Sequence, residues 1–106
     1  MIDQQTLDTA GRLLVDASPP GSGVILFGSN ARGDAGADSD ADFLVIEPEI
    51  IDKHREMVRL LEVLRPLRVP ADVLVTTREQ FRFWRDTPNT VYFHAAREGR
   101  RYGSIP

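Results

Sequence analysis

The sequence contains no cysteine, which excludes disulfide bonds, thiolate metal sites and thiol catalysis together. It also has no apolar run of the roughly 20 residues that a membrane span requires. Its first residues, from Met1 to Gln4, lack the basic and apolar segments of a signal peptide. We therefore expect a cytoplasmic protein without a membrane segment, whose chemistry depends on carboxylates, hydroxyls, histidine or arginine.

With 106 residues, the chain has the usual size of one domain, so we expect a single domain over residues 1–106. The net charge of -3 is unevenly distributed: residues 1–52 hold ten acids and two bases, whereas residues 53–106 hold six acids and eleven bases. Twelve of the 13 bases are arginine. Arginine suits bidentate pairing with phosphate or carboxylate, although a GC-rich genome explains the bias equally well.

Short apolar segments alternate with segments of helical spacing. The predicted strands cover residues 24–27, 42–46, 71–75 and 100–102. The predicted helices are one over residues 4–17 with Asp3 as N-cap, one over 50–64, a short one after Thr77, and one from the N-cap Thr87 to Gly99. In the second helix, the apolar face is expected to consist of Ile50, His54, Met57, Val58, Leu61 and Leu64. Strands alternating with helices indicate an α/β or α+β layer fold.

The glycine-rich segment between the first two strands carries the clearest chemical signal. Gly28 allows a sharp turn after a buried strand, so that the amides of Ser29 and Asn30 can point outward at the start of a short helix. Free amides at a helix start bind anions, and the Ser29 hydroxyl adds a donor. The segment therefore predicts a phosphate-binding turn.

Three aspartates are expected to meet beside this turn. Asp40 and Asp42 are two residues apart at the start of a strand, so their side chains project to the same face. Adjacent carboxylates repel each other unless a cation lies between them, and hard oxygen ligands suit Mg²⁺. If the strand that begins near Asp72 lies beside the 42–46 strand, Asp72 faces the same edge. Three carboxylates around two Mg²⁺ ions would support in-line displacement at phosphorus.

These motifs resemble the DNA polymerase β-like nucleotidyltransferases, and within them the small minimal nucleotidyltransferases. The pattern consists of Gly28-Ser29, ten further residues and Asp40-Ala41-Asp42, together with Ala31-Arg32-Gly33, Ser39 and the later Asp72. The resemblance covers about residues 24–102. It implies an α+β fold in which a small mixed sheet is backed by helices.

The same resemblance implies roles for individual residues. Gly28, Ser29, Arg32 and Ser39 would bind the nucleotide, and Asp40, Asp42 and Asp72 would bind Mg²⁺ and carry the catalysis. The implied reaction transfers AMP, or another nucleoside monophosphate, from ATP or another NTP to a hydroxyl. Minimal nucleotidyltransferases commonly occur as antitoxins beside a HEPN-domain ribonuclease toxin, so the implied partner is such a toxin, a second copy of the chain, or both.

Other interpretations of the acidic segment are weaker. A P-loop would require Lys and Ser or Thr where Asp34 and Ala35 stand, and a calcium loop would require glycine where Phe43 opens a strand. A solvated acidic loop is the main competing structure. Asp34 and Asp38 exceed what the motif needs, and they could pair with Arg32 in place of a phosphate.

The remaining polar and aromatic candidates are expected to be structural. His54 and His94 have no ligand partners at useful spacing. The aromatic residues between Phe81 and Phe93 favour a core or a partner interface over base stacking. Arg78, Arg82 and Arg85 recur on one helix face, for which solvation is the commonest explanation.

Two other classes of function remain open. One is an antitoxin that neutralises by binding alone, and the other is a small-molecule nucleotidyltransferase that modifies aminoglycoside-type antibiotics. The negative net charge and the lack of a basic appendage argue against nucleic acid as a partner.

Overall fold

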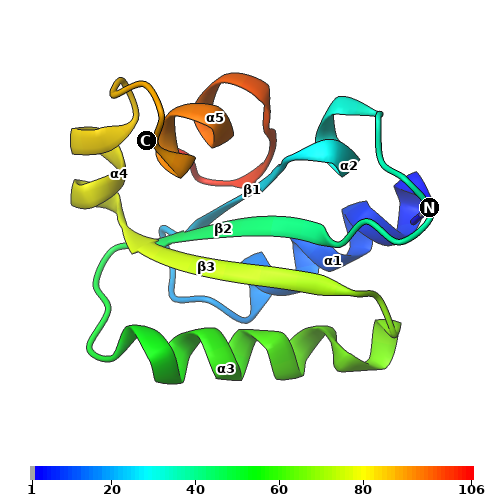
Figure 1. Ribbon diagram of the computed structural model, residues 1–106. Coiled ribbons are helices and arrows are strands. Elements are labelled where there is room, and N and C mark those ends of the chain that lie inside the picture. The colour runs from blue at the N-terminus through cyan, green and yellow to red at the C-terminus, as the bar shows by residue number, and fades with distance from the viewer. Residues whose placement is uncertain (1) are drawn as a thin grey trace.

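The computed structural model describes residues 2–106, in which helices and strands alternate (Figure 1). Their order is α1 (Gln4–Asp16), β1 (Gly23–Phe27), α2 (Ser29–Arg32), β2 (Ala41–Glu47), α3 (Lys53–Leu64), the 3-10 turn η1 (Arg65–Leu67), β3 (Ala71–Thr77), α4 (Arg78–Trp84), α5 (Val91–Glu98) and β4 (Arg100–Gly103). All four predicted strands are confirmed, including the short last one. None of the helices in this described part is long and apolar enough to cross a membrane.

The four strands form one mixed sheet in the order β3-β2-β1-β4. β1 runs antiparallel to both β2 and β4, whereas β2 and β3 run parallel. The parallel register places Asp42 directly opposite Asp72. The expected neighbourhood of these two strands, and the α+β fold with a mixed sheet, are therefore confirmed.

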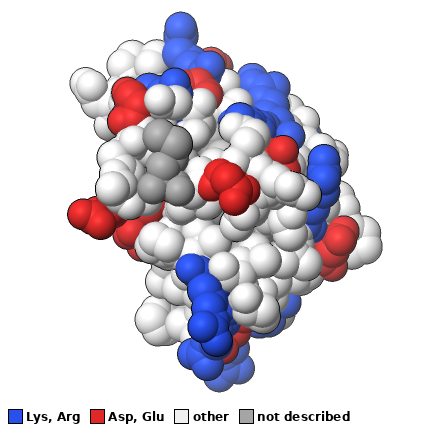
Figure 2. Space-filling model, turned by 90° about the vertical axis from the view of Figure 1, so that its right-hand side faces the viewer, with Lys and Arg blue, Asp and Glu red and all other residues white. Residues whose placement is uncertain are grey.

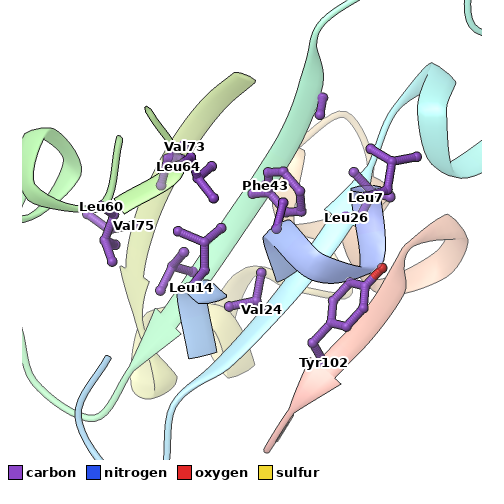
Figure 3. Packing of buried hydrophobic residues seen from close by; sticks show 13 residues of the cluster. Leu7, Leu14, Val24, Leu26, Phe43, Leu60, Leu64, Val73, Val75 and Tyr102 are labelled. Carbon is purple, nitrogen blue, oxygen red and sulfur yellow. The ribbon is translucent and has the colours of Figure 1, made fainter. Parts of the chain in front are cut away.

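Helices cover both faces of the sheet, with α1 and α3 on one side and α4 and α5 on the other (Figure 1). The larger core lies under α1 and α3, where Leu14 and Leu60 meet Phe43 of β2 (Figure 3). The smaller core lies on the opposite face, where Phe81 and Ala95 cover alternate residues of β1 and β2. Because side chains alternate along a strand, Asp42 faces the same side as this smaller core.

Helix starts follow the predicted caps in two of three cases. The Asp3 carboxylate accepts a hydrogen bond of 2.7 Å from the Thr6 amide, and the Thr77 hydroxyl accepts one of 3.1 Å from the Gln80 amide. The prediction that α5 starts at Thr87 is wrong, because Thr90 is the N-cap. Asn89 adopts a left-handed conformation with a φ of 67°, which cannot belong to a right-handed helix.

The predicted apolar face of α3 is also partly wrong. Leu60 and Leu64 are buried against the sheet, whereas Val58 and Leu61 retain 46% and 37% of their exposed surface. The helix begins at Lys53, so Ile50 precedes it and packs against the larger core from the segment between β2 and α3. Large apolar residues lie on more than one side of this helix. Their spacing therefore predicted a buried face that is rotated about the helix axis from the observed one.

Candidate active site

The turn after β1 is built around Gly28, whose φ is 79°. The Gly28 carbonyl accepts hydrogen bonds from the amides of Ala31 and Arg32, which starts the short helix α2. The amides of Ser29 and Asn30 precede these and therefore have no intrahelical acceptor. A Cβ atom at Gly28 would lie 2.6 Å from the Asp42 carboxylate. The turn is thus in direct contact with the first predicted metal ligand of β2.

The loop from Gly33 to Asp40 is tied to this turn by Asn30. The Asn30 side chain is buried and donates a hydrogen bond of 2.8 Å to the Asp40 carbonyl. The Ser39 hydroxyl instead accepts a hydrogen bond of 2.9 Å from the Gly36 amide. The structure therefore places Ser39 in a bonded turn within the loop, and its predicted contact with the nucleotide stays a prediction.

The carboxylates at the start of β2 and β3 influence each other electrostatically. Partial burial raises the pKa of Asp42, the negative charges of Asp72 and Asp40 raise it further, and Arg32 acts in the opposite direction. Such a shift means that the ionised Asp42 lacks sufficient positive charge nearby. The structure thus brings Asp42, Asp72 and Asp40 within electrostatic range of one another.

These side chains do not enclose a ready-made metal site. Among residues 2–106, no group of three or more His, Cys, Asp or Glu side chains is arranged to hold a metal ion. The donor chemistry nevertheless fits a hard divalent cation, because the three groups are carboxylates whose mutual repulsion a cation would relieve. The predicted assignment of Asp40, Asp42 and Asp72 as ligands stays a prediction.

Arg32 lies between two carboxylates at the end of α2. Its Nε donates to Asp34 at 3.2 Å, and its Nη1 donates to Glu98 at 3.0 Å. These carboxylates, Asp34 first, raise the pKa of Arg32 above its ordinary value. The same Oε1 atom of Glu98 also accepts a hydrogen bond of 3.4 Å from the Gly28 amide. Sequence reasoning missed Glu98, because nothing in the sequence links it to a turn 70 positions away.

An apolar cavity of about 420 Å³ opens beside the carboxylates. Asp42 and Asp72 contribute to its wall, and the rest of the lining is largely apolar, including Met57 and Leu61 from α3 and Leu74 from β3. Leu74 keeps 42% of its surface exposed there. The carboxylates thus border a surface suited to an apolar group.

The end of the molecule that carries α2 and the starts of β2 and β3 is shown in Figure 2. Acidic side chains lie near the middle of this face and also at its left and right margins, and basic side chains lie towards its top, right and lower margins. Both signs of charge are therefore interspersed on this face.

A second titratable cluster lies at the opposite end of β2, and sequence reasoning missed it as well. Glu47 is 2% exposed, and its Oε2 receives no hydrogen bond from a donor of the described residues. Burial, together with the nearby Glu56, raises the pKa of Glu47 to about 8. Arg59 bonds both oxygens of Glu56, at 2.8 and 2.7 Å, and lowers its pKa to about 2. Burial beside Glu56 therefore favours the uncharged form of Glu47.

The other candidates have structural surroundings. Arg78 donates to the carbonyls of Gly21 and Ser104, and Arg85 donates to that of Pro106. Phe81 is buried in the smaller core, whereas Phe83 is 72% exposed and packs edge-on against Trp84. Two of the three arginines that were predicted to form a solvated face thus donate hydrogen bonds to backbone carbonyls of a loop and of the C-terminal segment.

The structure thus places a glycine turn with free amides next to the carboxylates at the starts of two paired strands. The sequence model of the nucleotidyltransferase domain family matches residues 12–96, and the chain belongs to this family. The predicted resemblance is therefore confirmed. None of the curated proteins compared with the chain matches it.

Solved structures share the fold. A chain assigned as a minimal nucleotidyltransferase is 26% identical, covers 93% of this chain and 95% of its own length, and has a TM-score of 0.63. A chain from a toxin-antitoxin complex with AMP-PNP is 16% identical, with a TM-score of 0.61 and coverage of 97% and 75%. A chain from the complex of a tri-AMPylated Shewanella oneidensis HEPN toxin with its MNT antitoxin is 16% identical, with a TM-score of 0.58 and coverage of 97% and 74%.

Proposed function

We propose that residues 1–106 form one nucleotidyltransferase domain that transfers AMP from ATP to a hydroxyl group on a partner protein, and that the chain acts as the antitoxin of a HEPN-type toxin. The observation that carries the proposal is the contact between the Gly28 turn and Asp42, which itself lies opposite Asp72. A phosphate-binding element and a carboxylate pair thus adjoin each other in a chain of the nucleotidyltransferase family.

The turn would bind the triphosphate. The amides of Ser29 and Asn30 are available as donors, the Ser29 hydroxyl adds a third, and Arg32 supplies positive charge. Asp40, Asp42 and Asp72 would hold Mg²⁺, which when bound neutralises the developing charge on the phosphate oxygens. The raised pKa of Asp42 supports this assignment, because the negative charges of Asp72 and Asp40 add to the larger effect of burial, and a bound cation would offset those charges.

The reaction is a displacement at the α-phosphorus. The acceptor oxygen forms a bond to this phosphorus while the bond to the β-phosphate oxygen breaks, and pyrophosphate leaves. Asp72 borders the apolar cavity, so it can take the proton from an acceptor hydroxyl that is presented there. The products are an AMP ester of the acceptor and pyrophosphate.

The cavity supports a protein acceptor over a sugar. Its lining next to Asp72 includes Met57, Leu61 and Leu74, which would pack against an apolar side chain or segment but offer few hydrogen bonds to a polyhydroxylated, cationic aminoglycoside. Two of the similar structures are toxin-antitoxin complexes, one with AMP-PNP and one with an AMPylated HEPN toxin. Both observations favour a tyrosine, serine or threonine hydroxyl of a partner.

Mass spectrometry of the chain co-expressed with its HEPN partner tests the proposal. We expect one or more AMP groups on the partner, and none when Asp40→Asn replaces the wild type. Free aminoglycosides incubated with the chain and labelled ATP should remain unmodified. If the partner is never modified yet Asp40→Asn still neutralises it, the chain is an antitoxin that acts by binding alone, and the enzymatic proposal is wrong.

A further inference from the structure

The position of Glu98 follows from the register of the sheet. β4 pairs antiparallel with β1, with Arg100 opposite Leu26. Gly28 follows Leu26 by two residues and Glu98 precedes Arg100 by two, so the pairing ends just before both residues and leaves them close together. Gly99 fixes the approach, because a Cβ atom there would collide with Ile25 and with the carbonyl of Ala95. The last residue of α5 is therefore held beside the turn by the sheet itself.

Glu98 makes two contacts with the turn through one oxygen. Its Oε1 accepts from the Gly28 amide at 3.4 Å and from Arg32 Nη1 at 3.0 Å. Its side chain retains 26% of its exposed surface, compared with 63% for Asp34, the other carboxylate on Arg32. Glu98 is thus the more enclosed and more firmly anchored of the two partners.

The two carboxylates hold the Arg32 guanidinium in one orientation. Asp34 takes Nε and Glu98 takes Nη1, so Nη2 is left to donate to an incoming group. An arginine that is already oriented loses less side-chain entropy when it binds a phosphate. The Gly28 contact acts in the same direction, because it restrains the residue whose φ of 79° sets the turn.

We infer that Glu98 is a positioning residue, which orients Arg32 and the Gly28 turn for the phosphates of the nucleotide. The inference rests on the proposed function, since it assigns a task to a residue around the same site. Glu98 itself does not touch the nucleotide; it acts through Arg32 and the backbone of Gly28.

The test compares Glu98→Ala with Glu98→Gln. The alanine removes both contacts, so we expect the Kd for Mg-ATP, measured by calorimetry, to rise about tenfold. Glutamine keeps an acceptor oxygen at the same position and should restore most of the affinity. In an Arg32→Ala background, the loss from Glu98→Ala should largely disappear. Glu62→Ala is the matched control, because Glu62 forms a 2.8 Å ion pair with Arg65 at the end of α3, and neither residue belongs to β1, β4 or the Gly28 turn. This control should leave the Kd unchanged.

Amide hydrogen exchange at Gly28 provides a readout that needs no nucleotide. We expect faster exchange in Glu98→Ala than in the wild type or Glu62→Ala. Unchanged or tighter binding by Glu98→Ala would overturn the inference, and tighter binding would mean that Glu98 competes with phosphate. The inference would also be overturned if Glu98→Ala weakened Mg-ATP binding equally in the Arg32→Ala background. Unchanged hydrogen exchange at the Gly28 amide would overturn it as well. If the wild type binds no nucleotide, the proposed function fails, whereas the restraint on the turn is still decided by the exchange at Gly28.

Discussion

The two ends of β2 carry similar carboxylate groups in different surroundings. At the end where β2 begins, Asp42 lies near Asp40 and Asp72, and Arg32, the cation that acts on it, is bonded to Asp34 and Glu98. At the other end, Glu47 and Glu56 also adjoin, but Arg59 binds both oxygens of Glu56, and the raised pKa of Glu47 favours its uncharged form. One cluster is compensated within the protein, and the other is not.

The comparison shows why the size of a cavity does not identify the site. A cavity of about 530 Å³ lies at the Glu47 end, and it is larger than the one of about 420 Å³ beside Asp42 and Asp72. In the larger cavity, Arg59 neutralises Glu56, and the raised pKa of Glu47 favours its uncharged form, so the pair carries little uncompensated charge even though Glu47 Oε2 receives no hydrogen bond from the described residues. The carboxylates beside the smaller cavity lack such compensation, which is what a metal-nucleotide would supply.

The largest expected effect comes from removing charge at the uncompensated end. Asp42→Asn and Asp72→Asn should each lower AMP transfer about 10²–10³-fold, since each deletes a proposed metal ligand. Tm should not fall, because each substitution removes repulsion from a crowded cluster. Transfer assays and thermal melts check both outcomes, with Asp38→Asn in the neighbouring loop as the control. Near-normal transfer would exclude that aspartate from the mechanism, and a large drop in Tm would give it a structural role.

Removing divalent cations should have the next largest effect. A bare triphosphate is repelled by the three carboxylates, so its Kd should be about tenfold higher or more in EDTA than with Mg²⁺ or Mn²⁺. Calorimetry with and without EDTA measures this difference. Equal affinity under both conditions would mean that no metal bridges the carboxylates and the nucleotide.

At the Glu47 end of β2, we expect the raised pKa of Glu47 to make the stability of the protein depend on pH. The pKa of Glu47 rises from 4.5 to about 8 on folding, so its contribution to stability is complete below pH 4.5 and is lost as the pH rises towards 8. The lowered pKa of Glu56 acts only in acid, between pH 4.5 and about 2. We expect Tm to fall between pH 5 and 8 in the wild type and to change less in Glu47→Gln. Glu62→Gln, on the exposed side of α3, should follow the wild type; a Glu47→Gln curve parallel to the wild type would refute the buried proton.

The smallest expected effect is a loss of stability on substitution of the two glycines that flank α2. Gly33→Ala places alanine in the left-handed region, at φ 87° and ψ 10°, which costs about 1–2 kcal/mol. Gly28→Ala places it at φ 79° and ψ −159°, a region that essentially only glycine adopts. A Cβ at Gly33 meets nothing within 4 Å, whereas one at Gly28 meets the Asp42 carboxylate. Chemical denaturation should therefore show a larger loss of stability for Gly28→Ala. Equal losses would mean that neither the contact with Asp42 nor the conformation of Gly28 adds a cost beyond that at Gly33.

Much of the fold was predictable because its signals are local. The apolar runs of β1, β2 and β3, the caps at Asp3 and Thr77, and the glycine turn at Gly28 each depend on a few consecutive residues. The sequence predicted that Asp42 and Asp72 lie together only if their two strands are neighbours, and it did not show that they are. The start of α5 was missed because Thr87 and Thr90 are both good caps, and the conformation of Asn89 decides between them.

The polar partners of the candidate site were less predictable. The Glu98 contact depends on the β1–β4 register, and the Glu47–Glu56 pair depends on how α3 is rotated against the sheet. Local spacing misjudged that rotation, since it assigned Val58 and Leu61 to the buried face instead of Leu60. Ser39 matches the motif by position, yet its hydroxyl is bonded within its own loop. Pairings between distant segments are set by tertiary packing, which short sequence patterns do not encode.

The position of β4 at the edge of the sheet, next to β1, also bears on the order in which the molecule folds. β1 and β2 are close in sequence and can pair early, but the second neighbour of β1 comes from residues 100–103. Contacts between distant segments form late, because a long loop must close before they contribute. During synthesis, the Gly28 turn would therefore exist before the strand that anchors Glu98 beside it. A nascent chain that lacks residues 98–103 should have a collapsed β1–β2 hairpin with an unrestrained turn.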